Sequence, residues 1–109
     1  RELLTQASCD VALSNKKDVR CLVTATEITL TTPTVGGSTV EWECYLSFKS
    51  GATPTSLAYS ATPIKWVGVD CDADGDFIPS ANTNYEISIR AVNEDSAGNP
   101  VIVARVGVY

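Results

Sequence analysis

The chain has 109 residues, of which 44% are hydrophobic and 19% charged, and its formal net charge is −5. This length suits one domain with a single core, and no stretch approaches the roughly 18 apolar residues that a membrane-spanning helix needs. The acidic balance argues against a nucleic-acid partner, because neutralisation of phosphates by Lys and Arg provides much of that affinity.

Two residue types are missing altogether: the chain contains no His and no Met. Without His it lacks the commonest general base near neutral pH and the commonest metal-ligating side chain. We therefore predict that the protein is not an enzyme. Without an initiator Met, Arg1 is expected to be a cut end, left by removal of a signal peptide, by processing of a precursor, or by excision from a longer chain.

The first predicted strand covers residues 7–14, where Cys9, Val11 and Leu13 fall on one face of an alternating pattern. A second strand is expected over residues 21–31. Its apolar residues change from odd positions (Val23, Ala25) to even positions (Ile28, Leu30). This shift by one residue indicates a bulge or a strand that changes partner midway.

The clearest alternation in the chain covers residues 39–48, with Cys44, Leu46 and Phe48 on one face. No window carries the apolar stripe and cap of a helix. Further strands are expected over residues 56–61, 63–71 (with Val67, Val69 and Cys71 inward), 85–93 and 101–109. Short strands at this spacing predict an all-β fold, an antiparallel sandwich of two sheets.

Residues 82–93 resemble strand F of a fibronectin type III domain, and Gly98 follows where that family has a glycine in the F–G loop. Trp42 resembles the strand-B tryptophan of the same family. The resemblance covers roughly residues 22–109 and implies an immunoglobulin-like sandwich. It also implies that Tyr85 is a tyrosine corner, with its ring in the end of the sandwich and its hydroxyl bonded to backbone upstream.

The first 20 residues lie outside this resemblance. We therefore expect an N-terminal strand-like extension over 1–20 and a fibronectin type III-like domain over 21–109. The extension either pairs within its own domain or adds a strand to a neighbouring subunit. Its apolar residues are the candidate interaction residues: Leu3, Leu4, Val11 and Leu13.

The four cysteines are an even count in a small chain, which favours disulfides and an oxidising compartment. Their spacing contains no Cys-x-x-Cys, which argues against zinc or thioredoxin-type chemistry. Cys44 faces inward by alternation and Cys71 is its preferred partner, leaving Cys9 to pair with Cys21. The sequence leaves the other connectivities open, and four buried free thiols are the alternative.

The segment from Asp70 to Asp76 resembles the start of an EF-hand-type calcium loop, with carboxylates at Asp70, Asp72, Asp74 and Asp76. The twelfth position of such a loop would be Ala81 rather than a bidentate Glu, and no helix is expected beside it. We favour a charged turn with no cofactor, and keep calcium as the alternative.

Together these features favour a non-catalytic structural or interaction subunit at an extracellular, cell-surface or virion location. A pilus-like filament subunit and a phage decoration or tail protein both fit, with identical copies or a surface lattice as partners and no nucleic acid. The alternative is a calcium-dependent adhesion or carbohydrate-binding module of a larger secreted protein.

Overall fold

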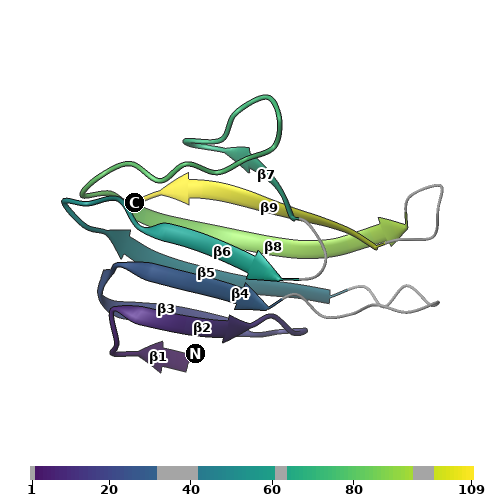
Figure 1. Cartoon of the computed structure of the whole chain (residues 1–109). Coiled ribbons are helices and arrows are strands. Elements are labelled where there is room, and N and C mark those ends of the chain that lie inside the picture. Colours follow the sequence, from purple (N-terminus) through teal and green to yellow (C-terminus); the bar gives the residue numbers. More distant parts are fainter. Residues whose placement is uncertain (1, 32–41, 61–63, 95–99) are drawn as a thin grey trace.

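The structure, a computed structural model, describes residues 2–31, 42–60, 64–94 and 100–109. Within these ranges the chain forms strands and no helix, so the prediction of an all-β protein is confirmed (Figure 1). In chain order the strands are β1 (Glu2–Leu4), β2 (Ser8–Ala12), β3 (Asp18–Ala25), β4 (Glu27–Thr31), β5 (Trp42–Ser50), β6 (Ser56–Ser60), β7 (Ile64–Gly68), β8 (Asn84–Glu94) and β9 (Pro100–Val108).

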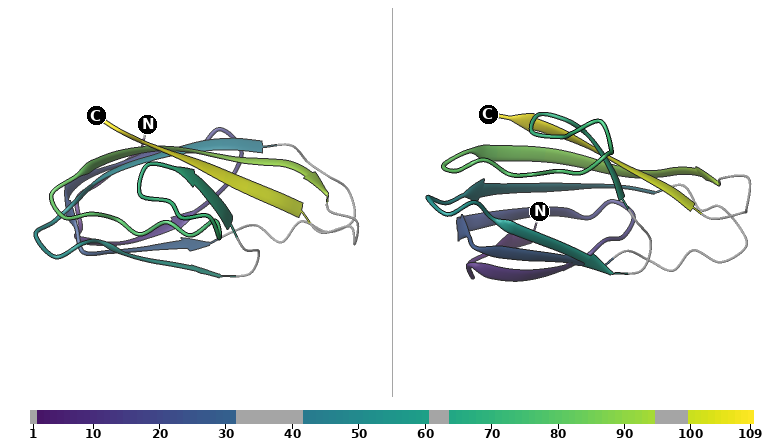
Figure 2. Two further views of the ribbon diagram at one scale, coloured as in Figure 1. Left: turned by 90° about the horizontal axis from the view of Figure 1, so that it is seen from above. Right: turned by 45° about the horizontal axis from the view of Figure 1, so that its top comes forward.

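The strands form two sheets that face each other across a shared core (Figure 2). The large sheet has six strands in the order β1-β3-β5-β8-β9-β7, and the small sheet has three in the order β2-β4-β6. Within the large sheet, β5–β8 and β8–β9 are antiparallel, whereas β1–β3, β3–β5 and β7–β9 are parallel. Both pairings of the small sheet are parallel. The prediction of an antiparallel sandwich is therefore wrong for the small sheet and for three of the five pairings of the large sheet.

The parallel pairing follows from the path of the chain between the sheets. From β1 to β6 the strands alternate between the large and the small sheet, so the chain makes three successive coils that stack in the same direction. The corners of the coils are bonded to one another. The Thr26 N–H donates to the Ala7 carbonyl at 2.8 Å, and the Ser56 N–H donates to the Thr26 carbonyl at 3.0 Å.

The corner between β3 and β4 lies where the apolar phase slips in the sequence. The pairing of β3 with β5 changes register between Arg20 and Thr24, and the chain leaves the large sheet at Thr26. Of the two predicted causes of the slip, the structure shows the change of partner, because β3 pairs in the large sheet and β4 pairs in the small sheet. The buried Thr55 hydroxyl closes the corner by donating to the Ala25 carbonyl at 2.6 Å.

Most of the predicted inward faces are buried. This holds for Cys9, Val11 and Leu13 near the N-terminus and for the alternating residues of β5, β8 and β9: Cys44, Leu46, Phe48, Tyr85, Ile87, Ile89, Ala91, Ile102, Ala104 and Val106. Val108, expected to point inward with Val106, is instead 52% exposed at the end of β9. Residues on both sides of the predicted domain boundary at residue 20 contribute to this one hydrophobic cluster.

For β7 and the turn after it, the prediction that Val67, Val69 and Cys71 point inward is wrong. Ile64 and Trp66 point into the core, whereas Val67 is half-buried and Val69 is exposed. Apolar side chains occupy both faces of this segment, so alternation alone gives no preference between them. The structure places the largest ring inside, where Trp66 is only 1% exposed.

The part of the large sheet formed by β8, β9 and β7 packs against the segment that links β7 to β8. Phe77 in this segment lies 5.1 Å from the Trp66 ring, 5.0 Å from Tyr85 and 6.4 Å from Phe48, between ring centroids. We call Phe48, Trp66, Phe77 and Tyr85 the aromatic cluster. It contains the largest fully buried side chains among the described residues, those of Trp66, Tyr85 and Phe48.

Candidate functional site

The most distinctive surface feature is an edge at which both sheets stop together. On this side β1 is the last strand of the large sheet and β2 is the last strand of the small sheet (Figure 1). Among the described residues, each of these strands pairs with a neighbour on one side only. We call residues 2–12, which form β1, β2 and the corner between them, the edge unit. A strand with one unpaired side offers backbone N–H and C=O groups to another strand.

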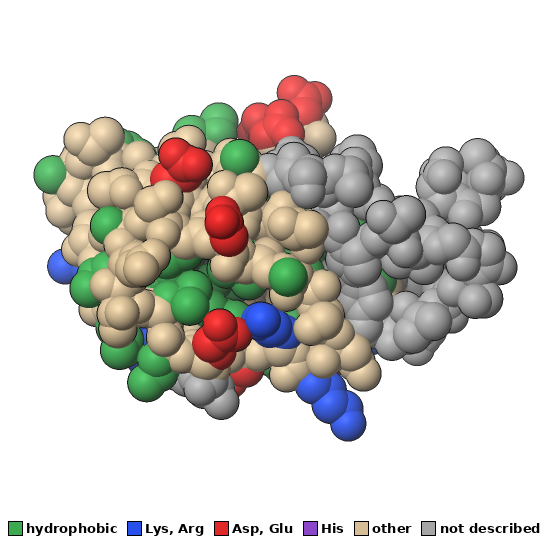
Figure 3. Space-filling view, turned by 60° about the horizontal axis from the view of Figure 1, so that its bottom comes forward, with side chains coloured by type: hydrophobic (Ala, Val, Ile, Leu, Met, Phe, Trp, Pro, Cys, Tyr) green, Lys and Arg blue, Asp and Glu red, His purple; other side chains and the backbone are tan. Residues whose placement is uncertain are grey.

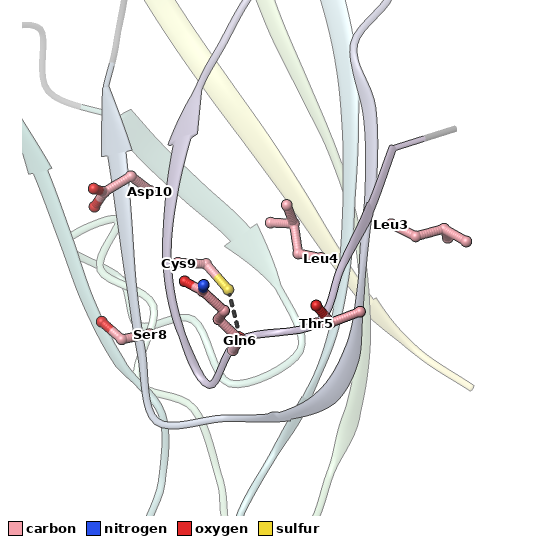
Figure 4. A pocket seen from close by; sticks show the side chains of 7 residues that line it. All are labelled: Leu3, Leu4, Thr5, Gln6, Ser8, Cys9 and Asp10. Carbon is pink, nitrogen blue, oxygen red and sulfur yellow. Dashed lines mark hydrogen bonds between the residues drawn. The ribbon is translucent and has the colours of Figure 1, made fainter.

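A groove of about 420 Å³ opens between the two strands of the edge unit. The Leu4 and Cys9 side chains point into the space between the strands, whereas Leu3 and Asp10 point away from it (Figure 4). Cys9 donates a hydrogen bond from its thiol to the Gln6 carbonyl at 2.8 Å. The lining residues are Leu3, Leu4, Thr5, Gln6, Ser8, Cys9 and Asp10.

The predicted interaction residues divide into two groups. Leu3 is 54% exposed, and Leu4 is half-buried where it packs against the core. Val11 and Leu13 are buried, because their alternation places them between the sheets. They are core residues, so their prediction as contact residues is wrong for this structure.

Further apolar surface lies beside the edge unit on β3, where the register with β5 changes. Leu22 is 52% exposed and Val23 is 37% exposed, although both belong to a strand whose neighbouring residues Cys21 and Ala25 are buried. The view in which this edge turns forward shows hydrophobic side chains between scattered charged ones (Figure 3). An exposed group of large apolar side chains next to an unpaired edge is typical of a contact surface.

Glu2 in the edge unit and Arg20 on the neighbouring strand β3 have partners within the chain. Glu2 forms an ion pair with Lys17 at 3.0 Å, and Arg20 lies over the Tyr109 ring at 5.9 Å from its centroid. Both side chains of the ion pair are partly exposed, so it stabilises β1 only weakly. The backbone pairing with β3 is therefore the main contact that holds β1 in place.

The four cysteines are free thiols in this structure. The predicted pairing of Cys44 with Cys71 is not formed. Cys44 is buried in the middle of β5 opposite Ile89, whereas Cys71 is half-buried in the turn after β7, where its thiol lies 3.5 Å from the Val69 carbonyl. Burial raises the pKa of the Cys44 thiol from its ordinary 9.0 to about 12.

Cys9 and Cys21, in contrast, are neighbours. They lie on facing strands of the two sheets, each is 6% exposed, and Cys9 is close enough to Cys21 to affect its ionisation. Burial and the proximity of Cys9 raise the pKa of Cys21 to about 12. The structure thus brings together one of the two predicted pairs.

The aspartates of the predicted calcium loop serve the turn itself. Asp72 accepts hydrogen bonds at one carboxylate oxygen from the backbone N–H groups of Asp74 and Asp76, at 2.9 Å and 3.0 Å. Asp70 accepts a hydrogen bond from the Tyr85 hydroxyl at 2.5 Å. In the described part of the chain, no group of three or more His, Cys, Asp or Glu side chains could hold a metal ion.

Tyr85 has the contacts expected of a tyrosine corner. Its ring is fully buried, and its hydroxyl accepts a hydrogen bond from the Ser80 backbone N–H at 2.6 Å while donating to Asp70. Burial and the hydrogen bond with Asp70 raise the pKa of Tyr85. The Trp42 side chain and Gly98, which the family resemblance also uses, lie outside the described residues.

Comparison with protein-family models, with curated proteins and with solved structures found no match. In the described ranges, no helix is long and apolar enough to cross a membrane.

Proposed function

We propose that this protein is a non-catalytic structural subunit that joins identical copies through its edge unit. The observation that carries the proposal is that both sheets end on the same side, with a groove between their last strands that Leu4 and Cys9 line together with polar side chains. A strand of another copy that adds to this edge can form backbone hydrogen bonds with β1 or β2, and its side chains can bind in the groove.

The stacking of the coils supports this proposal. In stacked-coil proteins each coil contacts only its neighbours, and an end coil needs a polar cap to remain soluble. Here the end coil is the edge unit, whose outer surface includes Leu3 and the groove beside Leu4. A second copy that covers this coil removes both the unpaired backbone and the apolar surface from water.

The setting that fits this role is an extracellular or virion surface assembly, such as a pilus-like filament or a phage decoration or tail. We also propose that the antiparallel strands β5, β8 and β9 resemble an immunoglobulin-like, fibronectin type III-like domain. This resemblance is supported by the contacts of Tyr85 and limited by the parallel pairing of the small sheet.

The test is sedimentation velocity of the wild-type protein over a range of concentrations, compared with two substituted proteins. Leu3→Lys places a charge on the exposed outer surface of β1, and Ile78→Lys places the same charge at another exposed apolar residue, 66% exposed and distant in sequence. We expect wild type and Ile78→Lys to form larger species and Leu3→Lys to stay monomeric. A wild-type protein that remains monomeric at millimolar concentration, or equal assembly by both variants, contradicts the proposal.

A further inference from the structure

The pair formed by Cys9 and Cys21 joins the edge unit to the body of the protein. Cys9 lies on β2 in the small sheet, and Cys21 lies on β3 in the large sheet. β2 contacts β3 across the core, and both thiols belong to the hydrophobic cluster. A covalent bond between them would tie the two sheets together at the open edge.

The two thiols are equally exposed but differ in their position relative to the groove. Cys9 lines the groove of the edge unit, whereas Cys21 does not. Burial raises the pKa of Cys21 to about 12, which leaves little thiolate at neutral pH. Since thiolates attack disulfides, Cys9 is the thiol that an external disulfide reaches first.

We propose that Cys9 and Cys21 form a reversible disulfide that latches the edge unit to the body of the protein. The oxidant is a small-molecule disulfide. The Cys9 thiolate attacks it, forms a mixed disulfide and releases one thiol. Cys21 then loses its proton, attacks the Cys9 sulfur and releases the second thiol. The two protein thiols are oxidised and one external disulfide is reduced to two thiols.

The latch holds the edge unit in its own domain. In the reduced protein β1 is only three residues long and is held by pairing with β3 and by a partly exposed ion pair, so it opens readily. The disulfide closes the short loop that contains the turn between β2 and β3, and this restricts the opened state. The latch does not depend on whether the edge joins another copy.

The experiment uses oxidised glutathione as the probe, with thiols counted by alkylation and mass spectrometry and with peptide mapping under non-reducing conditions. Cys44→Ala is the matched control, because Cys44 is equally buried but has no thiol contact with Cys9 or Cys21. We expect one disulfide, between Cys9 and Cys21, in both wild type and Cys44→Ala. Cys21→Ala should keep its remaining thiols reduced or carry glutathione on Cys9.

Hydrogen–deuterium exchange then measures whether the disulfide slows opening of the edge unit. In the oxidised monomer we expect backbone amides of residues 2–12 to exchange at least about tenfold more slowly than in the reduced monomer. Retention of all four thiols by wild type, or a disulfide that uses Cys44 or Cys71, would overturn the proposal. So would a Cys9–Cys21 disulfide that leaves the exchange of residues 2–12 unchanged. Both readouts are made on the monomer, so their failure is distinct from a failure to assemble.

Discussion

The two ends of the core differ in what fills them and in how they are closed. At the end formed by β5, β7, β8 and β9, four aromatic rings pack together and the segment after β7 covers them. At the end formed by β1 to β4, the buried side chains are smaller, among them Cys9, Val11, Val19 and Cys21, and the two sheets end side by side in β1 and β2. We infer that the aromatic end stabilises the fold, and we propose that the edge unit makes the contacts with other copies.

The largest expected effect is the loss of a ring from the aromatic cluster. Trp66→Ala removes a side chain that is 1% exposed and packs against Phe77, and it should lower the free energy of unfolding by about 3–5 kcal/mol. Urea denaturation followed by circular dichroism measures this. Tyr45→Ala is the control, because Tyr45 is 45% exposed on the same sheet and should cost less than about 1 kcal/mol. Equal losses of unfolding free energy in the two variants would contradict the placement of Trp66 in the buried aromatic cluster.

The end of β7 offers a backbone test at the same end of the core. Gly68 has a φ of 112°, and a Cβ added there would lie 2.4 Å from the Val106 carbonyl oxygen. Gly68→Ala should therefore cost at least about 2 kcal/mol of stability. At Gly107 the nearest atom would be 3.6 Å away, so Gly107→Ala should be close to neutral. Thermal unfolding compares the stabilities of the two variants. If Gly68→Ala were as stable as wild type, β7 would not lie as close to β9 as the structure places it.

A smaller effect is expected from the tyrosine hydroxyl. Tyr85→Phe keeps the ring in the cluster but leaves the Ser80 N–H and the Asp70 carboxylate without their shared partner. We expect a loss of about 1–2 kcal/mol, measured by urea denaturation at neutral pH. A variant as stable as wild type would mean that water replaces the hydroxyl at no cost.

The smallest effect concerns pH and the buried Cys44 thiol. Its pKa is raised from 9.0 to about 12 in the folded state, so its contribution to stability is fully present below pH 9 and is lost as the pH rises from 9 to 12. Near pH 9.5 the loss is under about 1 kcal/mol. Wild type should therefore lose more stability than Cys44→Ala between pH 8 and pH 9.5. Identical losses would place this thiol in contact with water.

The sequence predicted the faces of the strands better than their partners. Alternation correctly identified Cys44, Leu46 and Phe48 as buried, and the slip before Ile28 correctly indicated the break between β3 and β4. Alternation repeats every two residues whether the neighbouring strand is parallel or antiparallel, so it contains no information on direction. The stacked coils also produce no sequence repeat of fixed length, because successive coils contain different numbers of residues. Glu2 pairs with Val19, whereas Val19 pairs with Leu46, which is farther along the chain.

The candidate site shows the same limits. The apolar pattern near the N-terminus marked the edge unit, but it did not separate exposed Leu3 from buried Val11, which depends on where the chain crosses between the sheets. The aspartate spacing resembled a calcium loop, yet Asp72 bonds the backbone of its own turn, which short Asp side chains do readily. The predicted Cys9–Cys21 disulfide is not formed in the structure, although the two residues are neighbours because a single short turn separates their strands.

The location of the contact surface is the central claim, and hydrogen–deuterium exchange of concentrated against dilute protein tests it most directly. If copies join through the edge unit, backbone amides of residues 2–4 and 8–12 should become protected on assembly, while those of β7, the opposite edge of the large sheet, should not change. Protection that appears at β6 or β7 while residues 2–12 exchange at the same rate in both samples would contradict the account.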